Sequence, residues 1–404
     1  MLRNIGADEA CGMLYGLPVT HGTEMVALGE ALMRVSAAAV CAEMPVPPFD
    51  RSPYDGYAIY SGDTAGASRD NPAVLRITEE IPAGTVPRFA VTAGTAAKIL
   101  TGAPIPEGAD ATIKYESTEF TADEVRIFEP IPPNTDIARA GSDVRLGDKL
   151  VGAGSLITAP VISSLANQGF VRVAVFRKPA ITVISTGSEL CEAGTPLRPA
   201  SIYSSNVHTL SAYLSSVGAM PISGGAVPDE PDLIAKRLDA ALESSDMVIT
   251  TGGASVGDYD WAVTSAERIG AEVLFWKVSL RPGGAIVAAT KGGKVILGLS
   301  GNPAAAVIGL LRVAMPFVKK LCGMSDCFYP AVNVALKSAF PKGSPKMRIL
   351  RGRLEIDDSR AYFAESGTQD SGAVSSLAGC DLLGEIPMGS PPLSAGTLIK
   401  AYRI

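Results

Sequence analysis

The spacing of apolar residues divides the chain into stretches of different kinds. The first 45 residues predict helix, and the run from Thr23 or Glu24 to Met44 carries apolar side chains at roughly helical intervals. Four prolines within residues 45–53 then stop any helix. From about 55 to 140, short alternating runs such as AVLRITEEI and ATIKYESTEF predict a small all-β module.

Apolar strands alternate with amphipathic helices from Ala180 onward. AITVIST is followed by the helical pattern SSNVHTLSAYLSSVG, and the same alternation continues to a long helix that begins after Asn302 and ends near Gly323. This order predicts a parallel sheet covered on both faces. The tail from 328 to 404 returns to alternating strands, and residues 143–173 are compatible with helix up to Gly169.

These patterns together predict an α/β protein of four parts. The largest is a doubly wound parallel-sheet domain, and the other parts are a helical or extended linking domain, a small β module and a C-terminal β-barrel. The predicted boundaries are 1–45 and 141–178 for the linking domain, 46–140 for the β module, 179–325 for the α/β domain and 326–404 for the barrel.

Histidine and cysteine usage excludes several classes of chemistry. The 404 residues include only two histidines, His21 and His208, which hardly supply a Ser-His-Asp triad or a zinc-binding helix. Six scattered cysteines form no CxxC pair, which argues against a zinc or redox motif and suggests a reducing compartment. Chemistry must therefore depend on carboxylates, Lys and Arg side chains and backbone N–H groups.

Charge and hydropathy favour a cytoplasmic protein that binds small molecules. The net charge of −6 disfavours a nucleic-acid binder. The most apolar stretch, 303–322, contains Arg312, Lys319 and Lys320, so we interpret it as a buried helix and predict no membrane association. The first ten residues lack the apolar segment of a signal peptide.

Three polar loops follow predicted strands, at the edge of the sheet where ligands of parallel α/β folds bind. They are Ser185–Glu189, Thr250–Asp260 and Gly298–Pro303. In the third loop, Asn302 can cap the long helix, which would leave the N–H groups of Ala304 and Ala305 free to bind an oxyanion. An ordinary capped helix explains the same pattern.

The second loop, TTGGASVGDYD, combines glycines with acids. It matches neither a dinucleotide-binding fingerprint nor a P-loop. Asp258 and Asp260, with Glu189 and Asp229 after other strands, would suit Mg²⁺ beside phosphate oxygens. A glycine-rich turn with solvated acids is the alternative interpretation.

Positive charges gather near the end of the α/β pattern and in the tail. In a chain that is acidic overall, such a cluster favours a local anion site, although exposed charges explain it too. The residues are Lys277, Arg281, Lys346, Arg348 and Arg351.

In series, these segments resemble the molybdopterin molybdenumtransferase family, the group of MoeA and the gephyrin E domain. The motifs that carry the resemblance span about residues 45 to 385, nearly the whole chain. They include PPFDRSPYDGYA, LTGAPIPEGAD, ISTGSEL, VPDEP, TTGGASVGDYD, FWKVSLRPGG and LGLSGNP.

The resemblance implies insertion of molybdate into adenylylated molybdopterin, with Mg²⁺-assisted cleavage and AMP release. It also implies a homodimer whose cleft joins the α/β domain of one subunit to β modules of the other, with other molybdenum cofactor biosynthesis proteins as further partners. The α/β domain is then of the molybdopterin-binding type. The implied catalytic residues are Asp55, Asp143, Glu189, Asp229 and Asp260, of which Glu189, Asp229 and Asp260 would hold Mg²⁺. The implied substrate-binding residues are Thr101, Gly252, Gly253, Ser255, Lys277, Arg281, Ser300, Gly301, Asn302, Arg351, Ser375 and Ser376.

Two departures from the family pattern fall where the pocket is expected to hold molybdate. The family's KPGKP is RPGGA here, which places Gly284 where relatives have lysine. Its PGNPVS is SGNPAA, which places Ala305 where relatives have serine. Weaker oxyanion binding, a preference for tungstate, and a non-catalytic paralogue that binds the pterin nucleotide all stay open. A molybdopterin adenylyltransferase or a nucleotide deamidase is disfavoured, because the β-module motifs are present.

Overall fold

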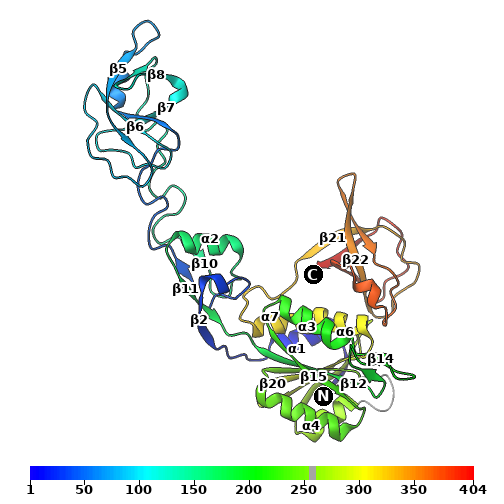
Figure 1. The fold of residues 1–404 in the computed structure, drawn as a ribbon. Helices are drawn as coiled ribbons and strands as arrows, with labels where there is room; N and C mark the ends of the chain where they lie inside the picture. The colour runs from blue at the N-terminus through cyan, green and yellow to red at the C-terminus, as the bar shows by residue number, and fades with distance from the viewer. Residues whose placement is uncertain (254–260) are drawn as a thin grey trace. The chain divides into compact units, whose positions relative to one another are not determined.

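A computed structural model describes residues 1–253 and 261–404 of the chain. Contacts divide it into two units, each with its own cores. Figure 1 shows their elements coloured along the chain. The first unit comprises Met1–Ala38, Ala153–Thr158 and Arg172–Ile404, and the second comprises Ala39–Gly152 and Ala159–Val171.

A seven-stranded sheet forms the centre of the first unit. Its strands are β1 (Leu2–Ile5), β12 (Ala180–Thr186), β15 (Met220–Val227), β16 (Met247–Thr251), β17 (Glu272–Val278), β19 (Val287–Lys291) and β20 (Lys294–Leu299). Their order in space is β1-β17-β19-β20-β16-β12-β15. All neighbours pair in parallel except β19, which is antiparallel to β17 and β20. Gly292 and Gly293, both with positive φ, join β19 to β20 in a tight hairpin, so this pair cannot be parallel.

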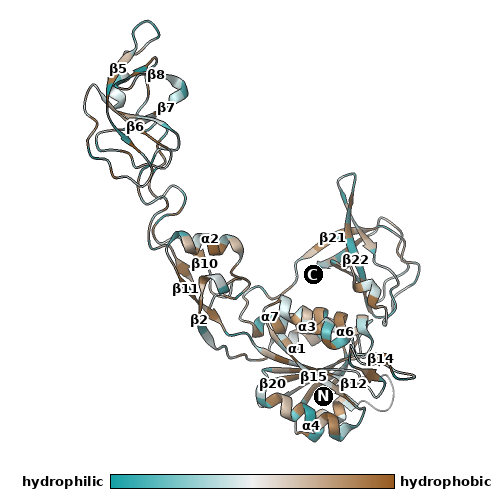
Figure 2. Cartoon of the chain, viewed as in Figure 1, coloured by the Kyte–Doolittle hydropathy of each residue, from teal (hydrophilic) through white to brown (hydrophobic). Residues whose placement is uncertain are grey.

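Helices cover both faces of this sheet, which confirms the predicted doubly wound α/β domain. One face carries α1 (Ala7–Tyr15), α3 (Asn206–Ser216), α6 (Pro303–Gly309) and α7 (Met315–Leu321), with a π-helical turn (Leu310–Ala314) between the last two. The other face carries α4 (Pro231–Ser244) and α5 (Trp261–Arg268). Figure 2 shows hydrophobic and hydrophilic positions alternating along α4, as expected of a helix with one buried face.

The first fifteen residues belong to this α/β core. Strand β1 pairs with β17, and Ile5, Ala7 and Leu14 are buried in the same cluster as the sheet. The sequence-based boundary placed these residues in a linking domain. A short strand and a nine-residue helix do not reveal by their own sequence which sheet they pack against. The remaining predicted boundaries stay predictions.

The helix predicted over 23–44 is wrong. Residues Thr23–Ala27 form β2, which pairs antiparallel with β11 (Arg172–Phe176), and a 3₁₀ turn follows at Leu28–Glu30. Met25 and Leu32, two members of the expected apolar stripe, are 52% and 54% exposed. The pairing partner lies far away in sequence, so local periodicity could not reveal it.

The tail of the chain forms the predicted C-terminal β-barrel. Its strands are β21 (Ala331–Leu336), β22 (Met347–Asp357), β23 (Arg360–Glu365), β24 (Leu382–Ile386) and β25 (Leu398–Arg403), with a 3₁₀ turn at Val374–Leu377. The order β22-β23-β21-β25-β24 closes because β22 also pairs with β24. The two-residue strand β18 (Leu280–Arg281) from the α/β domain pairs in parallel with the start of β22. The barrel and the α/β domain therefore share a hydrogen-bonded edge.

The second unit contains the predicted small β module. Its sheet has the order β7-β4-β6-β5-β9-β8. These strands are β4 (Gly56–Ile59), β5 (Ala73–Ile81), β6 (Thr95–Ile99), β7 (Ala111–Lys114), β8 (Thr118–Phe120) and β9 (Glu124–Ile127). The unit also holds β3 (Val40–Cys41) paired with β10 (Lys149–Val151), and 3₁₀ turns at Ser61–Thr64 and Tyr115–Ser117. Helix α2 (Ala159–Asn167) confirms the end of the helical pattern before Gly169, whereas its beginning, which contains β10, is not helical.

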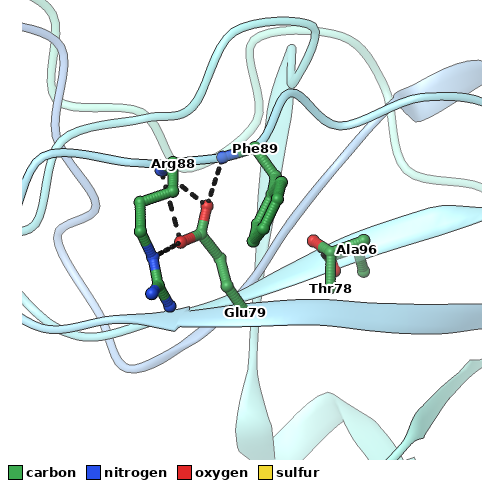
Figure 3. A network of polar contacts seen from close by, with 5 residues as sticks. All are labelled: Thr78, Glu79, Arg88, Phe89 and Ala96. Carbon is green, nitrogen blue, oxygen red and sulfur yellow. Dashed lines mark hydrogen bonds and ion pairs between the residues drawn. The ribbon is translucent and has the colours of Figure 1, made fainter.

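A buried carboxylate fastens a loop to β5 (Figure 3). The Glu79 side chain is 2% exposed, and its Oε1 accepts hydrogen bonds from the backbone N–H groups of Arg88 (3.0 Å) and Phe89 (2.8 Å). The Nε of Arg88 lies 3.4 Å from Oε2. Glu79 therefore satisfies backbone donors that would otherwise lack a partner.

We expect Glu79→Ala to lower the free energy of unfolding by about 2–3 kcal/mol, because hydrogen bonds to a charged, buried acceptor are among the stronger ones. The adjacent Glu80, which is exposed and paired with Lys98 at 2.8 Å, is the matched control, and Glu80→Ala should cost less than about 1 kcal/mol. Urea unfolding, with hydrogen exchange at the amides of Arg88 and Phe89, measures both. Equal losses for the two variants would contradict this role of Glu79.

Candidate functional site

The carboxyl ends of β12, β15, β16 and β20 line a cleft of about 430 Å³ in the first unit. The loops that follow these strands contribute Glu189, Asp229, Gly252 and Ser300. Side chains from the start of α3 close the cleft, and the Nδ2 of Asn206 donates a hydrogen bond to the carbonyl of Gly301 (2.8 Å). The loops that were predicted to form a polar rim therefore meet, as the parallel strands require.

Two carboxylates converge in this cleft. Burial and the nearby Glu189 carboxylate raise the pKa of Asp229, and the neighbouring Thr186 hydroxyl and Ser188 amide partly offset the rise. The Oδ1 atom of Asp229 is buried and has no hydrogen-bond partner among the residues that the structure describes. A buried acceptor of this kind is costly unless it binds something.

Glycine is required where the second loop leaves β16. Gly252 has a φ of +98°, and a Cβ atom there would lie 2.2 Å from the carbonyl oxygen of Thr186. Gly253 also has a positive φ, and a Cβ on Gly301 would lie 3.3 Å from the Cα of Gly252. The backbone therefore forms this wall of the cleft without side chains. The predicted site residues Ser255 and Asp260, like Asp258, lie outside the described residues.

A second cavity, of about 710 Å³, adjoins the first between the α/β domain and the C-terminal barrel. Ala285, Ser300 and Asn302 line both cavities. Four cations line the second cavity: Lys277, Arg281, Lys346 and Arg348. The site thus has an acidic side and a basic side that share a wall.

Three of these cations lie on strands β17, β18 and β22, of which β18 and β22 run side by side. Lys277 lies near the end of β17 with a φ of +63°, and its Nζ lies 4.2 Å from the centre of the Trp276 ring. In the pairing of β18 with β22, Arg281 stands opposite Arg348. Burial and the charge of Arg281 both lower the pKa of Arg348.

At the start of α6, one of the two N–H groups that were expected to be free already has a partner. Asn302 occupies the N-cap position, but its Nδ2 donates to the hydroxyl of Ser371 (3.1 Å). The N–H of Ala305 donates to the carbonyl of Ser371 (3.2 Å). A loop of the barrel therefore takes up a backbone donor that was expected to be free.

Arg351, an implied substrate ligand, lies elsewhere. Its side chain is fully buried, and Nε donates to the Oγ of Ser376 (2.7 Å) while Nη2 donates to the carbonyls of Thr368 and Asp370 (both 3.0 Å). Neither Arg351 nor Ser376 lines the two cavities described above, and Ser375 is exposed. In this structure Arg351 holds the loop that carries Gln369 and Ser371 to the basic cavity, while its Nη1 is buried and has no partner among the described residues.

Three further predicted residues lie in the second unit. Both the N–H and the hydroxyl of Thr101 donate to Oδ1 of Asp55 at 2.7 Å, and these bonds hold the pKa of Asp55 below its usual range. Asp143 is exposed, and its N–H donates to the carbonyl of Val46 (3.0 Å). Among the described residues, no group of three or more His, Cys, Asp or Glu side chains is arranged as a metal site.

The sequence did not assign several residues that line the basic cavity. Lys346 and Arg348 were noted only as members of a cation cluster that favours an anion site, and Gln369 and Ser371 were not singled out. The only signal for the cations was their excess in an acidic chain. Gln369 is placed by long-range contacts, with its Oε1 accepting from the N–H of Arg351 (2.9 Å).

Comparison with protein families matches three regions in order. The N-terminal region of MoeA (domains I and II) matches residues 5–169, a probable molybdopterin binding domain matches 182–320, and the C-terminal region of MoeA (domain IV) matches 333–404. No helix in the described parts of the chain has both the length and the hydropathy to span a membrane.

Relatives resemble the chain along nearly its whole length. A molybdopterin molybdenumtransferase of Bacillus subtilis (strain 168) is 34% identical over 404 residues, covering 99% of this chain and 94% of the relative. One from Staphylococcus aureus (strain MRSA252) is 36% identical, covering 97% and 94%. The crystal structure of the molybdopterin biosynthesis moeA protein from Pyrococcus horikoshii OT3 superposes with a TM-score of 0.85 at 28% identity, covering 99% of this chain and 100% of that one.

Proposed function

Because the chain belongs to the molybdopterin molybdenumtransferase family, a family of transferases of molybdenum cofactor biosynthesis, we propose that it inserts molybdate into adenylylated molybdopterin. The pyrophosphate link breaks in this reaction and AMP leaves with its phosphate. The observation that carries the proposal is the pair of adjoining cavities, one with carboxylates and one with cations, which share Ala285, Ser300 and Asn302.

The basic cavity suits the anions of this reaction. Molybdate and the phosphate groups of the nucleotide are oxyanions, and Lys277, Arg281 and Arg348 offer N–H donors toward them. Cations held by the protein before the substrate arrives stabilise charge that develops on a leaving phosphate. The glycine-lined wall at Gly252 lets the nucleotide approach the backbone closely.

The acidic cleft suits Mg²⁺. Asp229 has a buried oxygen without a partner, and the neighbouring Glu189 carboxylate repels it unless a cation lies nearby. Carboxylate oxygens are the ligands that Mg²⁺ prefers, so Glu189 and Asp229 would hold it, with Asp260 as the third candidate. When bound, Mg²⁺ would act as a Lewis acid toward phosphate oxygens.

We include a cytoplasmic homodimer in the proposal, in which Asp55, Thr101 and Asp143 of the second unit also serve the reaction. Two hydrogen bonds from Thr101 fix the orientation of the Asp55 carboxylate, which supports a functional role for Asp55. All six cysteines are free, which agrees with a reducing compartment.

The test follows AMP release by purified protein from adenylylated molybdopterin with Mg²⁺, in the presence and absence of molybdate. We expect release that depends on both ions and stops on chelation of the metal by EDTA. A parallel series with tungstate replaces molybdate to measure the preference between the two. Tight binding of the pterin nucleotide with no AMP above background would contradict the proposal and indicate a binding protein.

A further inference from the structure

The basic cavity lacks a cation at the position where the family pattern has one. Position 284 is glycine, and a Cβ atom there would lie 2.5 Å from the carbonyl oxygens of both Val278 and Leu280. A lysine cannot be restored at this position without moving the backbone. If the cavity binds a doubly charged oxyanion, another side chain must supply the missing charge.

Arg348 lines the same cavity as Gly284. It lies in β22 of the barrel, whereas Gly284 lies in the α/β domain, and both line the cavity. The Nε of Arg348 is buried and finds no hydrogen-bond partner within residues 1–253 and 261–404. Its guanidinium lies 5.4 Å from the centre of the Phe340 ring, which orients the group without satisfying its donors.

The arrangement of the two arginines is unfavourable without an anion. Arg281 and Arg348 face each other across paired strands, and Lys346 lies two residues before Arg348. Within the described part of the chain, none of these three makes an ion pair. Glu365 on β23 is near Arg348 but makes no ion pair with it among the described residues. Burial raises the pKa of Glu365, and the charge of Arg348 offsets only part of that rise. Of the described residues that line the cavity, only Asp370 has a carboxylate.

We propose that Arg348, assisted by Lys346, binds the tetrahedral oxyanion from the barrel side of the cavity and replaces the lysine that is missing at position 284. The identification of that oxyanion as molybdate rests on the proposed function. The anion site itself rests on the cavity, on the pairing of Arg281 with Arg348, and on the buried Nε of Arg348, which has no partner among the described residues. Arg348 thereby becomes a residue that determines oxyanion affinity in this chain.

The experiment measures binding of molybdate and of sulfate to the full chain by titration calorimetry. We expect Arg348→Gln to raise the Kd for molybdate by about 10- to 100-fold, because it removes a charge-assisted, two-pronged contact. Arg348→Lys keeps the charge and loses the planar fork, so a smaller rise is expected. The control is Arg353→Gln, since Arg353 lies on the same strand, is exposed and pairs with Glu355.

An unchanged Kd for molybdate in folded Arg348→Gln would overturn the proposal, as would an equal loss in Arg353→Gln. If Arg348→Gln does not fold, the Lys346→Gln variant is measured in its place. We expect Lys346→Gln to raise the Kd for molybdate by about 3- to 10-fold. An unchanged Kd in this variant would overturn the proposal. Sulfate bound as tightly as molybdate, and weakened equally by the substitution, would show a general oxyanion site and still support the role of Arg348.

The AMP assay separates this proposal from the proposed function. Arg348→Gln should raise the KM for molybdate more than it lowers kcat. If wild-type protein releases no AMP but binds molybdate through Arg348, the proposed function fails and the anion site stands. If wild-type protein releases AMP with the same molybdate KM as Arg348→Gln, the function stands and the role of Arg348 fails.

Discussion

Replacement of Asp229 by asparagine is expected to reduce AMP release by about 1,000-fold or more, since the loss of a carboxylate that holds a catalytic cation removes several kcal/mol of transition-state stabilisation. Asp229 contributes the buried oxygen without a partner in the acidic cleft. An asparagine has nearly the same shape but no charge, so the cleft should keep its form. The measurement is the rate of AMP release at saturating Mg²⁺ and at a series of Mg²⁺ concentrations.

The same Asp229→Asn substitution should leave the stability of the folded protein unchanged or raise it, although it lowers activity. Burial and Glu189 raise the pKa of Asp229, so the folded state holds the proton more tightly than the unfolded state does. The stabilising contribution of this group is therefore full below the unfolded pKa and is lost as pH rises through the folded pKa. At neutral pH the charged carboxylate costs stability, and Asp229→Asn should melt at the same temperature as wild type or higher.

The matched control for Asp229 is Asp232, three residues further along the chain. Its side chain is 88% exposed and pairs with Arg268 on the surface of α4 and α5. Asp232→Asn should leave AMP release within about twofold of wild type. A rate near that of wild type in Asp229→Asn would exclude Asp229 from the reaction.

The activity of wild-type protein should also fall on the acidic side of neutrality. Because the pKa of Asp229 lies above its ordinary value, protonation begins at a higher pH than for a solvated aspartate. The apparent Mg²⁺ affinity should fall over the same pH range, since protons and the cation compete for the carboxylate. A pH profile of AMP release at two Mg²⁺ concentrations checks this coupling.

Arg351→Met is expected to lower the free energy of unfolding by about 3–5 kcal/mol, because it breaks a buried network at its charged centre. Arg351 is fully buried and bonds to Ser376, Thr368 and Asp370, and burial lowers its pKa. Without the guanidinium, the two carbonyls and the hydroxyl lose their donors. Urea unfolding of the full chain measures the loss.

Arg353→Met is the control for this substitution, since Arg353 is 63% exposed on the same strand. It should change the free energy of unfolding by less than about 0.5 kcal/mol. The pair also separates two roles for Arg351. If Arg351 binds molybdate or phosphate, as the resemblance implies, Arg351→Met should weaken anion binding with little loss of stability. If Arg351 holds the loop through its buried contacts, the main effect of the substitution should be a lower free energy of unfolding. A stable Arg351→Met protein with weakened molybdate binding would contradict the structural role.

Several features followed from the sequence because they depend on local order. The alternation of apolar strands with helices predicted the doubly wound sheet, and the proline at the start of α6 fits its N-terminus at Pro303. The glycine pair at Gly252 and Gly253, visible in the sequence, occupies backbone positions with positive φ, which glycine adopts readily. Loops at the ends of parallel strands meet at one edge by topology alone, so Glu189 and Asp229 could be placed in one cleft.

Other features depended on contacts between residues far apart in sequence. The stretch at 23–27 is a strand because β11 pairs with it, and its own periodicity suggested a helix. Arg351 and Arg348 are three residues apart and equally charged, yet one is buried under a loop and the other opens into a cavity. The sequence alone determined which residue types could form the site and which strands they follow along the chain. The tertiary structure decided which cations line the basic cavity and which hold a loop, because burial and hydrogen-bond partners depend on elements that are distant in sequence.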